Sequence, residues 1–523
     1  MTKASFLHMF LYKALKNFAD GGAMRNRDNP RQLSIEEFKL PFAGELDKNN
    51  RWVKLAEVMP WDEISTVYNQ ALSEGTGRPG LPSRVAVGAL ILKHMMKLTD
   101  DETIEQIREN PYLQFFLGYP CYRYDHGFDP SLFVTIRKRL GEESVSAINQ
   151  LFINHTKRTQ GTGGKAASKA NGTEHTDDDS SETEVKREGM LLVDATAAPS
   201  DIRYPTDLGL LNEAREISEG IIDTLYEPSP GKVKPRTYRR KARKAYLSVA
   251  KKRRKTQQEI RRGIKAQLGY LGRNIRTIDR LLDEHTEHFP LSNKDQRRLW
   301  IIREVHRQQQ AMYRTKSKRI DGRIVSIAQP HVRPIVRGKA GAKVEFGAKI
   351  SASVVDGAVF MDHLSWDAYN ESGDLLNQVE NYRERFGYYP EVVIADTIYG
   401  TRDNRRYLKK HGIRYAGTAL GRPPKDRERT RKESKRRKKE AGIRNRIEGA
   451  FGVGKRRFGL DRVMTKLRET SESWIAMVIF VMNISRWMRD IFYPYLNRLL
   501  ITLFAESLMP VSWFESKTMN QSA

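Results

Sequence analysis

The sequence almost lacks cysteine: Cys121 is the single one in 523 residues. One thiol cannot form an intramolecular disulfide, and it cannot supply the ligands of a zinc ribbon. The sequence therefore excludes both a disulfide framework and a zinc ribbon. It indicates a reducing compartment, and we expect a cytoplasmic protein.

Long hydrophobic runs are also missing. The most apolar stretch, WIAMVIFVMNISRW, offers about 13 residues before Arg486, whereas a helix that spans a bilayer needs about 20. ASFLHMFLYKAL near the start is a short apolar run, and no convincing signal-peptide cleavage site follows it. We expect both stretches to be buried helices and the protein to have no membrane segment.

Acidic residues are scarce relative to basic ones. The chain has 64 Asp and Glu against 92 Lys and Arg, which gives a formal net charge of +28 and a pI near 9.9. An excess of this size predicts a polyanionic partner, and nucleic acid is the default for a soluble protein. The length of 523 residues, 39% of them hydrophobic, predicts two or three domains with real cores.

The N-terminal part has a helical pattern. After an uninformative extension at residues 1–51, residues 52–156 are predicted to form a compact all-helical domain. Ser83 is the expected N-cap of one helix, and Thr99 with Glu102 predicts a capping box. Short helices with a basic end fit a DNA-binding or dimerisation module, and a plain bundle with a charged outer face explains the same residues.

Two further segments differ in composition from the rest. Residues 157–188 are small, polar and charged without apolar periodicity, which predicts a flexible linker. Residues 207–322 are basic and helical in pattern, and we expect them to form a long antiparallel helical hairpin. Their positive charge would serve to contact phosphates, or it would belong only to helix faces exposed to solvent. The seam of the hairpin is predicted from apolar residues at heptad-like spacing: Leu268, Leu271, Ile275, Ile278 and Leu282.

Acidic residues follow two apolar strand patterns. The run Met190–Val193 predicts a buried strand, and Asp194 is expected at its end. The run EVVIAD ends in the same way at Asp396, and a hairpin is predicted between them in KVEFGAKISASVVDGAVFMDHLSW. A carboxylate where a buried strand emerges is unfavourable unless it binds something. A helix N-cap is the alternative for Asp194, but Ala-Thr-Ala-Ala-Pro starts a helix poorly.

The segment RNRIEGAFGVGKRRFG is predicted to be helical. Arg444, Glu448 and Lys455 then lie on nearly one face, which suits a divalent metal held by the acid and a polyanion held by the cations. An ion pair between Arg444 and Glu448 on a solvated face explains the same spacing. Residues 421–440 upstream are predicted to be a dense cationic loop that captures a DNA backbone, although any such run can match a nuclear-localisation pattern.

Asp194, Asp396 and Glu448 would form a three-carboxylate cluster if the two strands are neighbours. We predict these residues to be both the catalytic and the metal-binding groups. An oxygen-only ligand set selects Mg²⁺, or Mn²⁺ in its place, over zinc. Two ions about 3.5–4 Å apart could activate water or a 3′-hydroxyl and stabilise the leaving oxygen of a phosphodiester.

Three stretches of the sequence carry a resemblance to a known family: LLVDAT, VVIADTIYGTRDN and Arg444-x3-Glu448-x6-Lys455. They resemble bacterial insertion-sequence DDE transposases of the insertion sequence five-like group, which have an RNase H-like catalytic core. The family expects a tyrosine where this chain has Ala441, which puts one DNA contact in doubt. The segment RPGLPSRVAVGALILKHMMKLTDDETIEQIRENPYLQFFLG also looks like the N-terminal domain common in this group.

The resemblance implies an α/β fold: an RNase H-like catalytic core, with a mixed sheet flanked by helices. The core would comprise residues 189–206 and 323–490, with residues 207–322 as an insertion, an all-α N-terminal domain and a C-terminal helix and tail at 491–523. It further implies that Arg444 and Lys455 hold phosphates near the scissile bond. From their positive charge we add five neighbouring cations as DNA-binding candidates: Arg456, Arg457, Lys435, Arg436 and Arg437.

The implied activity is transposition. The protein would bind the terminal inverted repeats of an insertion sequence in double-stranded DNA, cleave strands with two metal ions, and join the free 3′-hydroxyl to target DNA. A homodimer would hold the two ends together, in a bacterial, nucleoid-associated setting with no small-molecule substrate. Rival readings are a related metal-dependent nuclease or junction resolvase, a non-catalytic DNA-binding relic, and a nucleoid structural protein, which explains only the charge.

Overall fold

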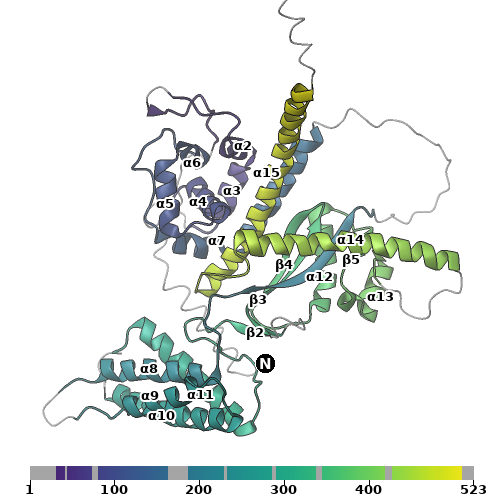
Figure 1. The fold of residues 1–523 in the computed structure, drawn as a ribbon. Helices are drawn as coiled ribbons and strands as arrows, with labels where there is room; N and C mark the ends of the chain where they lie inside the picture. The colour runs from purple at the N-terminus through teal and green to yellow at the C-terminus, as the bar shows by residue number, and fades with distance from the viewer. Residues whose placement is uncertain are drawn as a thin grey trace, which may run out of the picture.

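The computed structural model consists of a mixed sheet covered by helices, an N-terminal group of helices packed beside it, and a helical insertion at one end (Figure 1). The structure describes residues 31–41, 44–72, 80–162, 186–228, 233–284, 290–336, 344–417 and 427–508. The predicted extension, linker, cationic loop and tail therefore lie partly outside the described residues.

The N-terminal group consists of short helices followed by a long one: α2 (Arg51–Val58), α3 (Trp61–Asn69), α4 (Ser83–Met96), α5 (Asp100–Glu109), α6 (Pro111–Phe116) and α7 (Leu132–Thr162). The capping box of Thr99 and Glu102 is confirmed at the start of α5. The Ser83 cap is wrong: Pro82 is the N-cap, and the Ser83 hydroxyl instead bonds Ser65 Oγ at 2.9 Å.

Helix α7 continues to Thr162, so residues 157–162 of the predicted linker are helical. The sequence has no glycine or proline between Leu151 and Gln160, and the hydroxyls of Thr156 and Thr159 donate to carbonyls of the preceding turn within the helix. Residues 163–185 lie outside the described part of the chain.

The sheet has the order β2-β3-β1-β5-β6, with β4 also paired to β3. Strand β1 is antiparallel to β3 and parallel to β5. The predicted hairpin is confirmed as β3 and β4, joined by Asp356 and Gly357 at φ 49° and 78°, the left-handed pair that a tight hairpin turn requires. The strands are β1 (Met190–Pro199), β2 (Arg333–Val336), β3 (Val344–Val355), β4 (Ala358–Ser365), β5 (Val392–Ile394) and β6 (Arg414–Tyr415).

Helices flank this sheet, and α14 crosses in front of it in Figure 1. The flanking elements are η2 (Glu371–Asp374), α12 (Leu375–Phe386), η3 (Thr397–Tyr399), α13 (Arg402–Lys410), α14 (Arg427–Phe458) and α15 (Arg468–Leu508). The predicted cationic loop is wrong for residues 427–440, because they form the first turns of α14. Lys, Arg and Glu are good helix formers, and i,i+4 pairs such as Lys432 with Glu428, at 2.9 Å, support the helix.

The N-terminal helices share one hydrophobic core with the sheet. Phe152 of α7 packs against Phe480 of α15, with ring centroids 5.8 Å apart. The buried amide of Asn483 donates to Asn149 Oδ1 and to the Val359 carbonyl, both at 2.8 Å, and so ties α15 to α7 and β4. The apolar stretch that begins at Trp474 is thus a core helix, and none of the described helices combines the length and apolarity that a membrane crossing requires.

The insertion has a core of its own, formed by more helices than the expected hairpin. The two-helix prediction is wrong because the apolar face of an additional helix covers the predicted seam, with Leu211 and Ile222 buried against Leu271 and Ile278. The buried Arg215 guanidinium donates to Gln267 Oε1 at 3.1 Å and fixes this packing. The helices are α8 (Asp207–Leu225), α9 (Arg239–Ala250), α10 (Gln257–Asp283) and α11 (Asn293–Thr315).

Candidate active site

The two strand-associated aspartates are neighbours in register. In the parallel pair, Leu192 of β1 lies opposite Ile394 of β5, and Asp194 and Asp396 follow two residues later on each side. The expectation that β1 ends at Asp194 is wrong, because the strand continues to Pro199 on its antiparallel pairing with β3. What ends before Asp194 is the pairing with β5, so the sheet opens at the level of the two acids.

Asp396 is held at the turn after β5. Its carboxylate caps η3 by accepting the Thr397 N–H at 2.6 Å, and the Tyr415 hydroxyl donates to its carbonyl at 2.9 Å. The side chain is 50% exposed, which leaves carboxylate oxygen accessible to a ligand. The turn therefore fixes the backbone while keeping the functional group open.

Asp194 is more buried than Asp396. Burial raises the pKa of its carboxyl group, opposed by the Ala195 N–H that donates to Oδ1 at 2.8 Å. The negative charges of Glu371 and Asp396 raise this pKa further, while Arg444 lowers it. A carboxyl pKa that is raised by burial and by neighbouring acids is typical of a functional site, and these acids together could bind a cation.

Helix α14 brings the third predicted acid to this edge. Its buried residues Ile447 and Phe451 belong to the main core, so Arg444 and Glu448 face the rim of the sheet. Arg444 Nη1 lies 3.0 Å from Asp396 Oδ1, and its Nη2 lies 3.2 Å from Glu448 Oε1. The ion pair that the sequence offered as an alternative is therefore present, and Arg444 also connects Glu448 to Asp396.

The three predicted acids determine which metal ion this edge of the sheet could bind. Asp194, Asp396 and Glu448 supply only carboxylate oxygens, which is the chemistry that Mg²⁺ and Mn²⁺ prefer. Across the described ranges, however, no three His, Cys, Asp or Glu side chains are close enough together to hold a metal ion. Arg444 is the group that connects Asp396 and Glu448 in this conformation. The three acids thus have the ligand chemistry of a magnesium site and lie at the same edge of the sheet. In this conformation Glu448 is paired with Arg444.

The remaining cations predicted to bind DNA all lie on α14: Lys435, Arg436, Arg437, Lys455, Arg456 and Arg457. Two of them form long ion pairs with neighbouring acids, at 3.7 Å for Arg436 with Glu440 and 3.6 Å for Arg437 with Glu433. The far end of the helix is fixed by Lys97, whose ammonium donates to the Arg456 carbonyl at 2.8 Å. The structure thus arranges these cations along one exposed helix.

Sequence reasoning missed two groups beside Asp194. Glu371 in η2 lies near enough to raise the Asp194 pKa, and its carboxylate pairs with Lys349 at 2.9 Å. Tyr399 is fully buried, and its hydroxyl has no hydrogen-bond partner in the described part of the chain. Burial together with the charges of Glu371 and Asp194 raises its pKa. No local pattern marks either residue, because only the tertiary fold brings them to the site.

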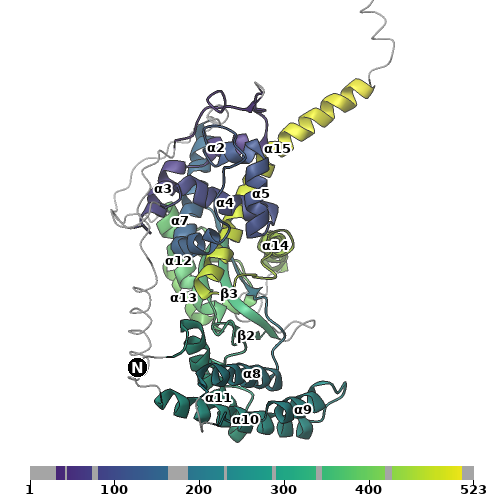
Figure 2. The ribbon, with the colours of Figure 1, turned by 90° about the vertical axis from the view of Figure 1, so that its left-hand side faces the viewer.

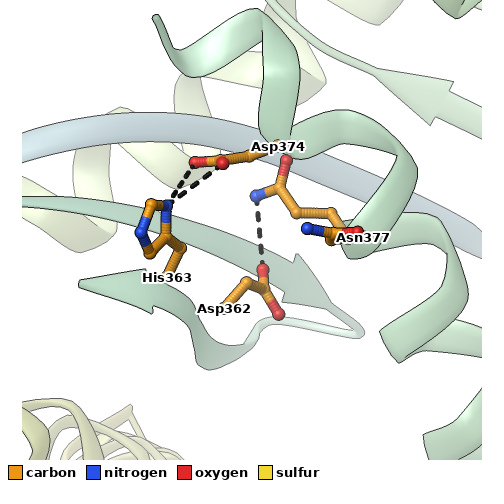
Figure 3. A pocket seen from close by; sticks show the side chains of 5 residues that line it. Asp362, His363, Asp374 and Asn377 are labelled. Carbon is orange, nitrogen blue, oxygen red and sulfur yellow. Dashed lines mark hydrogen bonds and ion pairs between the residues drawn. The ribbon is translucent and has the colours of Figure 1, made fainter. Parts of the chain in front are cut away.

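A separate polar cavity of about 150 Å³ lies between β4 and α12 (Figure 3). His363 Nδ1 contacts both carboxylate oxygens of Asp374 at 3.1 Å, and Gln378 bonds Asp362 at 3.3 Å. The residues that line it are Asp362, His363, Asp374, Asn377 and Gln378, which include none of the predicted site residues.

Comparisons with known proteins match two parts of the chain. A family described as "Transposase DDE domain" matches residues 393–485, which include Asp396, Arg444, Glu448 and Lys455. A family described as "Transposase domain (DUF772)" matches residues 41–139, which hold the N-terminal helices. The stretch around Asp194 lies outside both matches.

One curated relative is an uncharacterized protein, ORF8 in the nfe locus of Rhizobium meliloti. It is 27% identical over 165 residues, which is 32% of this chain and 69% of the relative. No solved structure matches the chain significantly. The DDE domain implies an RNase H-like fold, consistent with the mixed sheet and its helices, and it implies an enzyme that acts on DNA and typically uses divalent metal ions. Residues 41–139 and 393–485 are thus each similar to a transposase domain, and together the two matches support a transposase function.

Proposed function

We propose that the protein binds the ends of an insertion sequence, cleaves DNA strands there and joins the free 3′-hydroxyl to target DNA. One observation carries the proposal: Asp194 and Asp396 lie in register where β1 and β5 stop pairing, and Arg444 connects Glu448 to the same place. Carboxylates concentrated at one point of a chain with net charge +28 fit metal-assisted chemistry on a polyanion.

Asp194, Asp396 and Glu448 are the residues that would hold two Mg²⁺ ions, with Mn²⁺ able to substitute. When bound, such ions supply an activated water or 3′-hydroxyl and neutralise charge at the scissile phosphate. Glu448 becomes available once its ion pair with Arg444 opens. The guanidinium of Arg444 is then free to bind phosphate through two parallel N–H groups. Glu371 adds negative charge next to Asp194 and favours cation uptake.

The cations along α14 would hold the DNA backbone beside these acids. Lys455 follows Glu448 on the same face, while Lys435, Arg436, Arg437, Arg456 and Arg457 extend the positive surface along the helix. Double-stranded DNA, both as terminal inverted repeats and as target, is the proposed partner. Two ends must be joined to complete transposition, so we propose that the protein works as a homodimer.

The test uses purified protein and DNA from the ends of its own locus. The native chain should cleave at defined ends with Mg²⁺, and Glu448→Gln should reduce cleavage by about a thousandfold or more while DNA binding persists. Glu428→Gln is the matched control, because Glu428 lies on the same helix with its side chain 77% exposed. It should cleave like the native chain.

Other results would change the proposal. Cleavage without preference for the ends would favour a metal-dependent nuclease on the same site. Tight binding without cleavage in Mg²⁺ or Mn²⁺ would contradict the enzymatic function and leave a DNA-binding relic of a transposase. Equal cleavage by native and Glu448→Gln protein would remove Glu448 from the site.

A further inference from the structure

The insertion carries a dense cationic surface that the candidate active site does not include. Residues 233–258, which contain α9 and the turn after it, hold no Asp or Glu. We define the insertion basic surface by six exposed cations of this segment, none of which pairs with a carboxylate among the described residues: Arg240, Arg243, Lys244, Arg253, Arg254 and Lys255.

Three cations elsewhere in the insertion are paired with carboxylates instead. On α11, Arg303 pairs with Asp279, Arg307 pairs with Glu304 at 2.6 Å, and Arg298 pairs with Asp295 at 3.4 Å. Those cations are neutralised within the fold. The cations of the insertion basic surface have no such compensation, so they repel one another and create a positive potential that a polyanion relieves.

The core segments on either side of the insertion are bonded to each other and to the segment that follows α14. The Val463 N–H donates to the Pro199 carbonyl at 2.8 Å, and the Asp201 N–H donates to the Val463 carbonyl at 3.0 Å. Arg462 pairs with the Asp201 carboxylate at 2.9 Å. The returning chain joins the same point, because Gln329 Nε2 donates to the Asp201 carbonyl at 3.2 Å. These bonds hold the two chain segments from which the insertion extends close to the end of α14.

Both views place α9 and α14 on the same side of the molecule. In Figure 2 both helices lie at the right, and that side faces the viewer in Figure 1, where α14 crosses in front of the sheet. In both views α9 lies below α14, so a duplex that contacts both surfaces would cross α14 and pass down over the insertion.

We propose that the insertion basic surface binds the phosphate backbone of the same DNA duplex whose scissile phosphate lies at the candidate active site. The inference rests on the proposed function only for the position of the scissile phosphate. Duplex DNA fits because it is a stiff polyanion with regularly spaced phosphates, and four of the six cations are arginines, whose planar fork matches phosphate geometry. The surface would increase the affinity for DNA and fix the position of the protein along the duplex, without recognising the base sequence.

The first experiment measures how DNA binding depends on salt, in EDTA so that no cleavage can occur. The triple variant Arg243→Gln, Lys244→Gln and Arg254→Gln is compared with the native chain on a labelled duplex of arbitrary sequence. The control carries the same charge change on paired cations: Arg298→Gln, Arg303→Gln and Arg307→Gln. Circular dichroism melting checks that both variants fold, and glutamine preserves the helix at exposed positions.

Each lost phosphate contact reduces the slope of log K against log salt by about 0.9. We expect a reduction of roughly 2–3 in the α9 variant and less than about 1 in the control. An equal reduction in both variants would mean that only net charge matters, and it would overturn the inference. So would an α9 variant with the native slope.

The second experiment asks whether the contact is made to the same duplex as the candidate active site. Glu448→Gln protein, with and without the α9 substitutions, is footprinted on end DNA with hydroxyl radicals. Protection should be lost at a stretch away from the cleavage position and kept at that position. Loss at neither place would contradict the inference. If the salt dependence and the footprint come out as expected but the native chain does not cleave DNA, the proposed function is refuted and the inference about the insertion basic surface stands.

Discussion

Arg444 Nη1 lies 3.0 Å from Asp396 Oδ1, and this ion pair joins helix α14 to the end of strand β5. The two side chains are 30% and 50% exposed, so the pair is weak, within the range of about 0–1 kcal/mol found for solvent-exposed ion pairs. A weak pair can be displaced. Arg444 therefore keeps Asp396 and Glu448 compensated until a stronger cation competes for them.

Arg444→Gln should bind divalent metal more tightly than the native chain. Two exposed ion pairs of about 0.2–1 kcal/mol each predict a roughly two- to thirtyfold gain once the competing guanidinium is removed. Titration with Mn²⁺ in the absence of DNA, followed by electron paramagnetic resonance, measures this directly. Arg446→Gln is the control, since Arg446 is exposed on the same helix, and its affinity should stay close to native. Weaker metal binding by Arg444→Gln would show that the arginine supports the site rather than competing for it.

Asp194→Asn should stabilise the metal-free protein at neutral pH. Burial raises the Asp194 pKa above its ordinary 3.8, so the native state binds this proton more tightly than the unfolded state, and stability falls as pH rises through that window. Removing the charge should add roughly 1 kcal/mol of unfolding free energy, as replacements at strained sites do. The gain should disappear as pH falls towards 3.8.

Thermal melting of native and Asp194→Asn protein in EDTA measures this gain. Asp461→Asn, at an exposed position after α14, is the control and should melt with the native chain. Mg²⁺ should then stabilise the native chain more than Asp194→Asn. A destabilised asparagine variant would mean that the charged carboxylate is already compensated in the metal-free fold.

His94 should make the protein sensitive to mild acid. It lies on α4, fully buried with its ring against Trp474. Neither ring nitrogen has a hydrogen-bond partner among the described residues, and burial lowers its pKa from 6.5 to about 3. The unfolded state takes up the proton first, so stability is lost as pH falls below 6.5. The loss is roughly 2 kcal/mol by about pH 5, at about 1.4 kcal/mol for each pH unit.

His94→Leu keeps the volume and removes the titration. Urea unfolding at neutral and mildly acidic pH should show a smaller acid loss in the variant than in the native chain, with the neutral value as internal reference. The same acid loss in both proteins would assign the sensitivity to another group, of which His331, with a pKa lowered to about 4 by burial, is the next candidate.

Gly347→Ala should distort the strand that carries Asp194. A Cβ at Gly347 would lie 2.1 Å from the Ala198 carbonyl oxygen and 2.7 Å from Pro199 Cα, and both are backbone atoms that cannot yield cheaply. We expect a loss of roughly 2–3 kcal/mol, the usual range for overpacking. Gly269→Ala, on α10 with open space around it, is the control and should gain up to about 1 kcal/mol. Equal melting temperatures for the two variants would contradict the close β1–β3 approach.

The sequence alone determined those features that depend on neighbouring residues. The capping box at Thr99, the Asp356-Gly357 hairpin and the apolar runs before Asp194 and Asp396 are local patterns, and the structure has all of them. The positive charge and the spacing of Arg444 and Glu448 were likewise readable, because they depend on composition and helical periodicity.

Only the tertiary structure decided how these parts meet. The parallel register of β1 and β5, the connection from Glu448 through Arg444 to Asp396, and the approach of Glu371 and Tyr399 join residues far apart in the chain. The insertion differed from its expected hairpin for the same reason, since α8 covers a seam that looked complete from α10 alone. Local patterns specify single elements, whereas strand pairing and core packing depend on which distant surfaces bury one another.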